Sequence, residues 1–379
     1  MTEPSYPIAK AAAARIHDHF ARHLATAARQ RDEHLAPLAD IETVEAIIDA
    51  GFWASLQREE GYAPRISLAF VAPEQVARPL LLERPFRLAP QLLTRVAPAV
   101  ERPGIHLGVW RERDDLWVWG ATRNLPSLCL VLEVVAPGLL VIKHSRGEES
   151  GKFVNIAVFQ GDQVKVIDQR AATVPDCPAL LTSLLGLESQ FMAVDSVNVL
   201  IQLAVSMRAH ARGGSLLVVP ANTQTWQESI LSPISYSVLP PFAALADLVQ
   251  KDLSETPHSQ WQDAFRRTVD GVAGLTAVDG ATVITDKYEL LAFGAKIVQR
   301  PGLAQLSQLI VTEPIEGVGA AIADPGQLGG TRHFSAAQFA QDQQDAISLV
   351  ASQDGRFTVF AWSPCEKMVH AHRIETLLL

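Results

Sequence analysis

The chain has few cysteines, no excess of basic residues and no long apolar run. Its three cysteines, Cys129, Cys177 and Cys365, are far apart and form no Cys-x-x-Cys pair, which argues against a disulfide framework and against a zinc site. The formal net charge is −9 at pH 7. Broad binding to nucleic acid or to an anionic membrane needs a basic surface, so an anionic ligand would have to be held by a local cluster of cations.

No window reaches the roughly 18 consecutive apolar residues of a membrane-spanning helix. The best candidate, LCLVLEVVAPGLLVIK, is interrupted by Glu133, Pro137 and Gly138. The N-terminal stretch MTEPSYPIAKAAAARIHDHF mixes acids and histidines with apolar residues and lacks the apolar core of a secretory signal. We therefore expect a soluble, cytoplasmic protein that binds neither nucleic acid nor membrane.

The chain does contain enough apolar residues to form the cores of two domains. It has 379 residues, of which 48% are hydrophobic, and domains usually hold about 100–200 residues. Helical periodicity over residues 8–29 and 41–57 is followed by short β-branched and aromatic runs separated by Gly, Pro, Asp and Asn. Residues 1–185 are therefore predicted to form an α+β accessory domain rich in antiparallel strands, ending near the proline-containing connector QRAATVPDCPA.

Residues 186–379 have a different pattern, in which helices and strands alternate. Apolar periodicity predicts helices over 189–212, 239–253 and 259–275, and short apolar runs predict strands at GSLLVV, ATVIT and YELLAFGAKI. AISLVAS and RFTVFAW, joined by the turn QDG, predict a closing hairpin. The fold class is therefore α/β (α+β), with a central mixed β-sheet flanked by helices in this second domain.

The first candidate site is the stretch GGTRHFSAAQF, residues 329–339. Its glycines let the backbone approach a ligand closely, and amides near a helix start bind anions. Arg332 adds a planar cation suited to phosphate oxygens, while Thr331 and Ser335 can donate hydrogen bonds or cap a helix that we expect to begin near Ala336. The alternative is a capped helix with a surface arginine and a core histidine.

The second candidate site is VDGATVIT, where Asp279 stands at the mouth of a predicted strand and is followed by Gly280. Such a carboxylate can coordinate Mg²⁺ or Mn²⁺ and orient an attacking hydroxyl. The alternative is an ordinary turn, because Asp-Gly is a common turn dipeptide.

Taken together, the order of these segments resembles the diadenylate cyclase domain of the DisA type, whose signatures are DGA and G-[TS]-RHR. The similarity runs from about residue 190 to 365. LIQLAVSMRAHARGGSLLVVP looks like the opening helix and first strand of that family, and AVDGATVI resembles its DGA segment. GGTRHFSAAQF followed by DAISLVASQDGRFTVF resembles its RHR helix and closing hairpin.

The resemblance implies a metal-dependent nucleotidyltransferase that condenses two ATP molecules into cyclic di-AMP and two pyrophosphates, with Mg²⁺ or Mn²⁺ as cofactor. Because each domain holds half a reaction centre, it implies a face-to-face homodimer or a higher homo-oligomer. By the same resemblance Asp279, Arg332 and His333 are catalytic residues, and Asp279 and Asp354 bind the metal. The implied nucleotide-binding residues are Gly280, Ala281, Lys296, Gly330, Thr331, Ser335 and Ser352.

This chain departs from the family pattern at two places. Phe334 replaces the second arginine of RHR, and Ser352, Gln353 and Asp354 stand where the family usually has Ser-Glu-Glu. A catalytically degenerate domain that binds a nucleotide or cyclic dinucleotide as a sensor is therefore an alternative. A third possibility is a structural partner module, with the function in the N-terminal half. That half resembles the accessory domain that precedes some soluble bacterial members and is expected to act as a sensor.

Overall fold

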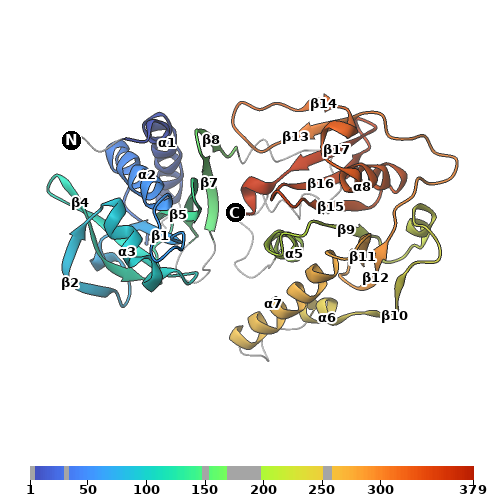
Figure 1. Cartoon of the computed structure of the whole chain (residues 1–379), viewed down its shortest axis with the longest axis horizontal. Coiled ribbons are helices and arrows are strands. Elements are labelled where there is room, and N and C mark those ends of the chain that lie inside the picture. Colours follow the sequence, from blue (N-terminus) through green and yellow to red (C-terminus); the bar gives the residue numbers. More distant parts are fainter. Residues whose placement is uncertain (1–4, 30–33, 147–152, 169–197, 251–257) are drawn as a thin grey trace. The chain divides into compact units, whose positions relative to one another are not determined.

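The computed structural model describes residues 5–29, 34–146, 153–168, 198–250 and 258–379 (Figure 1). The chain divides into two compact units, the first comprising residues 1–167 with Leu379 and the second residues 168–378. The boundary predicted at residue 185 falls in the range 169–197, outside the described residues. Both units combine α-helices with a mixed β-sheet, which confirms the predicted α/β class at this level.

The first unit has an eight-stranded sheet in the order β2-β4-β3-β1-β5-β6-β7-β8. Within it β1 and β3 are parallel and the other neighbouring strands are antiparallel, as the sequence predicts. Its helices are α1 (Pro7–Arg29), α2 (Ile41–Ser55) and α3 (Pro90–Val100). Its strands are β1 (Ile66–Phe70), β2 (Leu80–Arg87), β3 (His106–Glu112), β4 (Asp115–Thr122), β5 (Leu130–Ala136), β6 (Leu139–Ser145), β7 (Phe153–Gln160) and β8 (Gln163–Val166).

The core of the first unit lies between the helices and one face of this sheet. Side chains alternate across a strand, so Leu130 and Leu132 of β5 face the helices while Val131 faces the other side. On that other side Trp119 is buried, and its indole N–H donates to the carbonyl of Val71 at 2.8 Å. The strands β3 and β4 form the hairpin predicted from the turn Arg-Glu-Arg-Asp-Asp.

The second unit has a nine-stranded sheet in the order β10-β12-β11-β9-β15-β16-β17-β13-β14. β9 and β11 are parallel, as are β13 and β17, and the remaining neighbours are antiparallel. Its α-helices are α5 (Val199–Ala209), α6 (Ala244–Gln250), α7 (His258–Leu275) and α8 (Thr331–Asp342). Its strands are β9 (Gly214–Val219), β10 (Tyr236–Phe242), β11 (Ala281–Thr285), β12 (Leu290–Ala295), β13 (Leu309–Thr312), β14 (Ala321–Ala323), β15 (Ile347–Ala351), β16 (Phe357–Ser363) and β17 (Met368–Arg373).

Helices cover both faces of this second sheet. α5 and α7 pack on one face, against residues such as Leu216 of β9 and Leu349 of β15. α8 packs on the opposite face, where Ala336 and Ala340 meet Phe360 of β16 (Figure 1). The predicted central mixed sheet flanked by helices is therefore what the second unit contains.

Two of the predicted elements differ from the structure. The helix expected to begin near Ala336 begins at Thr331, with Gly330 as its N-cap residue. Leu239 and the residues up to Phe242, predicted as the start of a helix, belong to strand β10. Pro240 and Pro241 supply no backbone N–H, which a helix needs and an edge strand can do without. In the part of the chain that is described, none of the helices combines the length and apolarity needed to cross a bilayer.

Candidate functional site

Four neighbouring strands of the second unit have one end at the same edge of the sheet. β9 and β11 begin there, and β12 and β15 end there, because Ala281 of β11 pairs with both Ser215 of β9 and Ala295 of β12. Ala351 at the end of β15 pairs with Gly214. We call this end the glycine edge, because Gly213, Gly280 and Gly294 lie there with φ of +70°, +106° and +64°.

The glycines at this edge allow a close approach of backbone segments. A Cβ on Gly280 would lie 2.5 Å from the carbonyl carbon of Gly294, and a Cβ on Gly214 would lie 2.6 Å from the carbonyl oxygen of Thr276. Real Cβ contacts are not that short, so both positions exclude a side chain. Gly280 was predicted to be a site residue, whereas Gly213 and Gly294 were not. The pair Gly213–Gly214 directly before a strand was the available signal.

Asp279 projects from the glycine edge into solvent. It directly precedes Gly280 and β11, and its side chain is 89% exposed. The Lys296 ammonium, at the end of β12, lies 4.0 Å from the Asp279 carboxylate. Ala281 is buried in β11 and contributes backbone rather than a reactive group. Asp279, Gly280, Ala281 and Lys296 are thus brought together.

Arg332 reaches the same edge from α8. A methyl group placed on Gly213 would lie 3.0 Å from Arg332 Nη1 and 3.3 Å from the carbonyl oxygen of Ala351. Ser215 of β9 pairs with Ala281 of β11, and Gly213 and Asp279 each stand two residues before this pair. Neighbouring strands are about 4.8 Å apart. The guanidinium of Arg332 and the carboxylate of Asp279 therefore converge on one edge of the sheet, although 53 positions separate them in the chain.

The first turn of α8 presents backbone amides beside Arg332. Gly330 caps the helix without a side-chain hydrogen bond, and Thr331 is exposed at the first helical position. The first amides of an α-helix usually have no acceptor within the helix. The His333 amide donates to the Gly330 carbonyl at 3.0 Å, so the amides of Thr331 and Arg332 are the candidates for binding an anion. Ser335 lies within the helix and is half-buried, so the alternative that it caps the helix is wrong. The reason is that the helix begins earlier than the sequence predicts.

His333 points into the protein rather than into solvent. It is 5% exposed, packs edge-on against the ring of Phe360 at 6.2 Å between centroids, and its Nε2 has no hydrogen-bond partner among the described residues. Burial lowers the pKa of His333, while the Asp354 carboxylate acts in the opposite direction. At pH 7 the imidazole is therefore neutral. A buried ring nitrogen without a partner is costly.

Ser352 and Asp354 lie in the turn between β15 and β16, next to Gly213. The Ser352 hydroxyl and the Arg356 cation are both bound to Asp354, with 3.2 Å between Arg356 Nε and the carboxylate, and the hydrogen bond from Ser352 is the main cause that lowers the Asp354 pKa. Arg208 on α5 holds the turn by donating to the carbonyl of Gly355 at 3.1 Å. Asp354 is thus engaged within its own turn, whereas Asp279 is open.

Asp279 is the residue that would bind a divalent metal at this edge of the sheet. Among the described residues no group of three or more His, Cys, Asp or Glu side chains is arranged to hold a metal ion. Mg²⁺ is commonly held by one or two carboxylates together with substrate phosphates and water, rather than by a cage of protein ligands. The exposed carboxylate of Asp279, at the same end of the sheet as Arg332 of α8, fits that kind of site.

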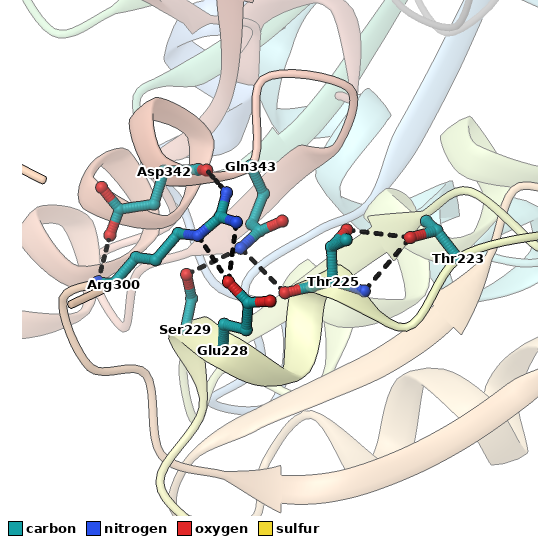
Figure 2. A network of polar contacts seen from close by, with 7 residues as sticks. All are labelled: Thr223, Thr225, Glu228, Ser229, Arg300, Asp342 and Gln343. Atoms are coloured by element: carbon teal, nitrogen blue, oxygen red, sulfur yellow. Dashed lines mark hydrogen bonds and ion pairs between the residues drawn. The ribbon is translucent and has the colours of Figure 1, made fainter. Parts of the chain in front are cut away.

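A buried polar network fixes the opposite end of α8 (Figure 2). The Asp342 carboxylate, 3% exposed, accepts from the backbone N–H of Arg300 at 2.7 Å. Gln343 donates to the carbonyl of Thr225 and to the hydroxyl of Ser229, and Arg300 also pairs with Glu228. The network ties α8 to the 3₁₀ helix Thr225–Ser229, and so holds the helix that carries Arg332.

We expect Asp342→Ala to destabilise the second unit by about 2–3 kcal/mol, because it leaves buried donors of Arg300 and Gln338 without their acceptor. Urea unfolding followed by circular dichroism measures this change. Gln344→Ala, an exposed neighbour just past α8, is the control and should alter stability by less than about 0.5 kcal/mol. Equal effects of the two substitutions would show that the network does not anchor α8.

Comparison with known proteins gives a family match in the first unit. Residues 33–123 match the family model described as the probable sensor domain DACNV. The matched range runs from just before α2 to the end of β4 and includes no residue of the glycine edge. No curated protein matches the chain.

Proposed function

We propose that the second unit is a diadenylate cyclase domain and that the first unit is its sensor domain. The observation that carries this proposal is the convergence of the Asp279 carboxylate and the Arg332 guanidinium on the glycine edge. Phosphoryl transfer depends mainly on positioning and on charge stabilisation. A carboxylate for the attacking hydroxyl and a guanidinium with helix amides for the phosphates supply both requirements.

In the proposed reaction each 3′-oxygen forms a bond to the α-phosphorus of the other ATP. The bond from that phosphorus to the bridging oxygen breaks, its electron pair leaves with pyrophosphate, and the hydroxyl proton is released. Asp279 orients the 3′-hydroxyl, and Arg332 with the first amides of α8 holds the phosphates. Mg²⁺ or Mn²⁺ bound at Asp279 would supply charge neutralisation. Gly280, Gly330 and Thr331 let the backbone lie close to the nucleotide.

One domain of this kind binds one ATP, so the reaction requires two domains with their glycine edges facing each other. We therefore propose a homodimer or a higher homo-oligomer as the active form. Since ATP is the substrate, we place the reaction in the cytoplasm. The similarity of residues 33–123 to a probable sensor domain supports control of the reaction by a signal that the first unit detects.

The direct test is to incubate the purified full chain with ATP and either Mg²⁺ or Mn²⁺, and to look for cyclic di-AMP and pyrophosphate by mass spectrometry. We expect both products in a ratio of one cyclic di-AMP to two pyrophosphates. A folded, oligomeric protein that makes neither product with either metal would contradict the cyclase proposal.

A second candidate function is a nucleotide or cyclic-dinucleotide sensor without turnover. It is favoured by two features: α8 has Phe334 where the resembling family has arginine, and Asp354 is engaged by Ser352 and Arg356. Tight ATP binding by calorimetry together with no product would support this function. Under it, Phe334→Arg is the variant to examine for a gain of activity.

A further inference from the structure

A second guanidinium without a partner among the described residues lies near the glycine edge. It belongs to Arg373 of β17, a strand that contains neither of the two sequence motifs. Arg373 is the last residue of β17 and pairs with Thr358 of β16, whose neighbour Phe357 pairs with Ala351. Arg373 therefore reaches the same edge of the sheet as Gly213. Three strand intervals separate β17 from β9, which is about 14 Å of backbone.

The side chain of Arg373 lies on the face of the sheet that α8 covers. Val369 and Ala371 of β17 pack in the cluster with Ala336 and Ala340 of α8, and residues two apart on a strand share a face. Arg373 thus follows Ala371 on that face, toward the edge where α8 begins. His333, in the first turn of α8, contacts the ring of Phe360, which pairs with Ala371.

Arg373 is half-buried and has no ion pair or hydrogen bond among the described residues, in contrast to Arg356, which is paired with Asp354. Arg332 likewise has no partner in the described part of the chain. The Arg373 cation also contributes to lowering the pKa of the buried His333. Two guanidinium groups without a partner among the described residues therefore lie at the end of the sheet where α8 begins. Such an arrangement suits a ligand with several negative charges.

We propose that Arg373 binds the terminal phosphates of the nucleotide, the part that leaves as pyrophosphate. This inference rests on the proposed function. The proposal follows from the order of three side chains along the sheet. Asp279 precedes β11, Arg332 lies over β9 and β15, and Arg373 is the last residue of β17. A nucleotide whose reacting end is at Asp279 and whose phosphates run past Arg332 extends toward Arg373.

The test compares the binding of ATP, inorganic triphosphate and AMP, each with Mg²⁺, to the full chain by calorimetry. Arg373→Ala should weaken the binding of ATP and of triphosphate about tenfold, as expected for the loss of one charge-assisted contact, and should leave AMP binding unchanged. Arg373→Gln, which keeps much of the side-chain volume, should give the same result if the alanine variant is unstable. Arg266→Ala, an exposed arginine on α7 with the same change in charge, is the control.

Each outcome decides between the two proposals. Equal weakening of all three ligands, or no change with Arg373→Ala while Arg332→Ala weakens ATP binding, would overturn the assignment of Arg373 and leave the cyclase proposal standing. A wild-type chain that binds neither ATP nor triphosphate would overturn the cyclase proposal, and the assignment of Arg373 with it.

Discussion

Replacing Asp279 with asparagine is expected to lower the rate of cyclic di-AMP formation by at least about 100-fold, the usual scale for losing a group that handles a reacting hydroxyl. Asparagine keeps the shape of the side chain and removes its negative charge, so it orients the 3′-hydroxyl poorly and binds a divalent metal weakly. The side chain is 89% exposed, so the fold should be unaffected. Product formation is measured by mass spectrometry and folding by circular dichroism.

The matched control for this variant is Asp345→Asn. Asp345 is also exposed, but it precedes β15 and therefore lies at the end of that strand remote from the glycine edge. The control removes the same charge from the same unit and should retain activity within about twofold, as expected for a surface site away from the chemistry. Undiminished product from Asp279→Asn would exclude Asp279 from the reaction. Equal losses in the two variants would point to a general effect of charge.

The second large effect is expected from Gly280→Ala, which should destabilise the second unit by about 3 kcal/mol and abolish product formation. A non-glycine residue at its φ of +106° is strained by roughly 1–3 kcal/mol. In addition, the new Cβ would lie 2.5 Å from the carbonyl carbon of Gly294, so β11 and β12 must separate. That movement displaces Asp279, which stands next to Gly280. Urea unfolding and the product assay measure the two effects.

The control for this substitution is a glycine that has no such constraint. Gly271 lies within α7, and a Cβ there meets no atom within 4 Å. Gly271→Ala should stabilise the unit by roughly 0.5–1 kcal/mol, because alanine favours a helix interior. If Gly280→Ala proved as stable as the wild type, the close approach of β11 and β12 at the glycine edge would be wrong.

Local patterns predicted much of the fold. The apolar period of residues 8–29 matches α1, and the short β-branched runs match β5, β6 and β7. The failures have local causes as well. Pro240 and Pro241 lie in a strand that was predicted to be helical, and α8 begins at Thr331 because Gly330, rather than a hydroxyl side chain, is its N-cap residue. Strands β13, β14 and β17 were not predicted; β13 and β14 have only four and three residues, too few for a clear alternating pattern.

The candidate site divides in a similar way. Asp279 and Arg332 could be proposed as site residues from the sequence alone. A lone carboxylate before a strand can bind a metal, and an arginine after two glycines can bind phosphate. The alternative of a surface arginine and a core histidine is what the structure shows, since Arg332 is exposed and His333 is buried. The contact of His333 with Phe360, 27 positions away, could not be predicted. Gly294 and Arg373 could not be predicted as site residues either, because each is placed at the glycine edge by pairing with a neighbouring strand.

Side-chain periodicity was enough to predict most of the helices and strands, and the residue types alone show which functional groups are available for phosphate and metal chemistry. It is the packing of the strands that places the starts of β9, β11 and β16 beside the ends of β15 and β17 at the glycine edge, on the face of the sheet where α8 packs. Strand order and register are set by packing between segments distant in the chain. That packing is what brings Asp279, Arg332 and Arg373 to one edge of the sheet.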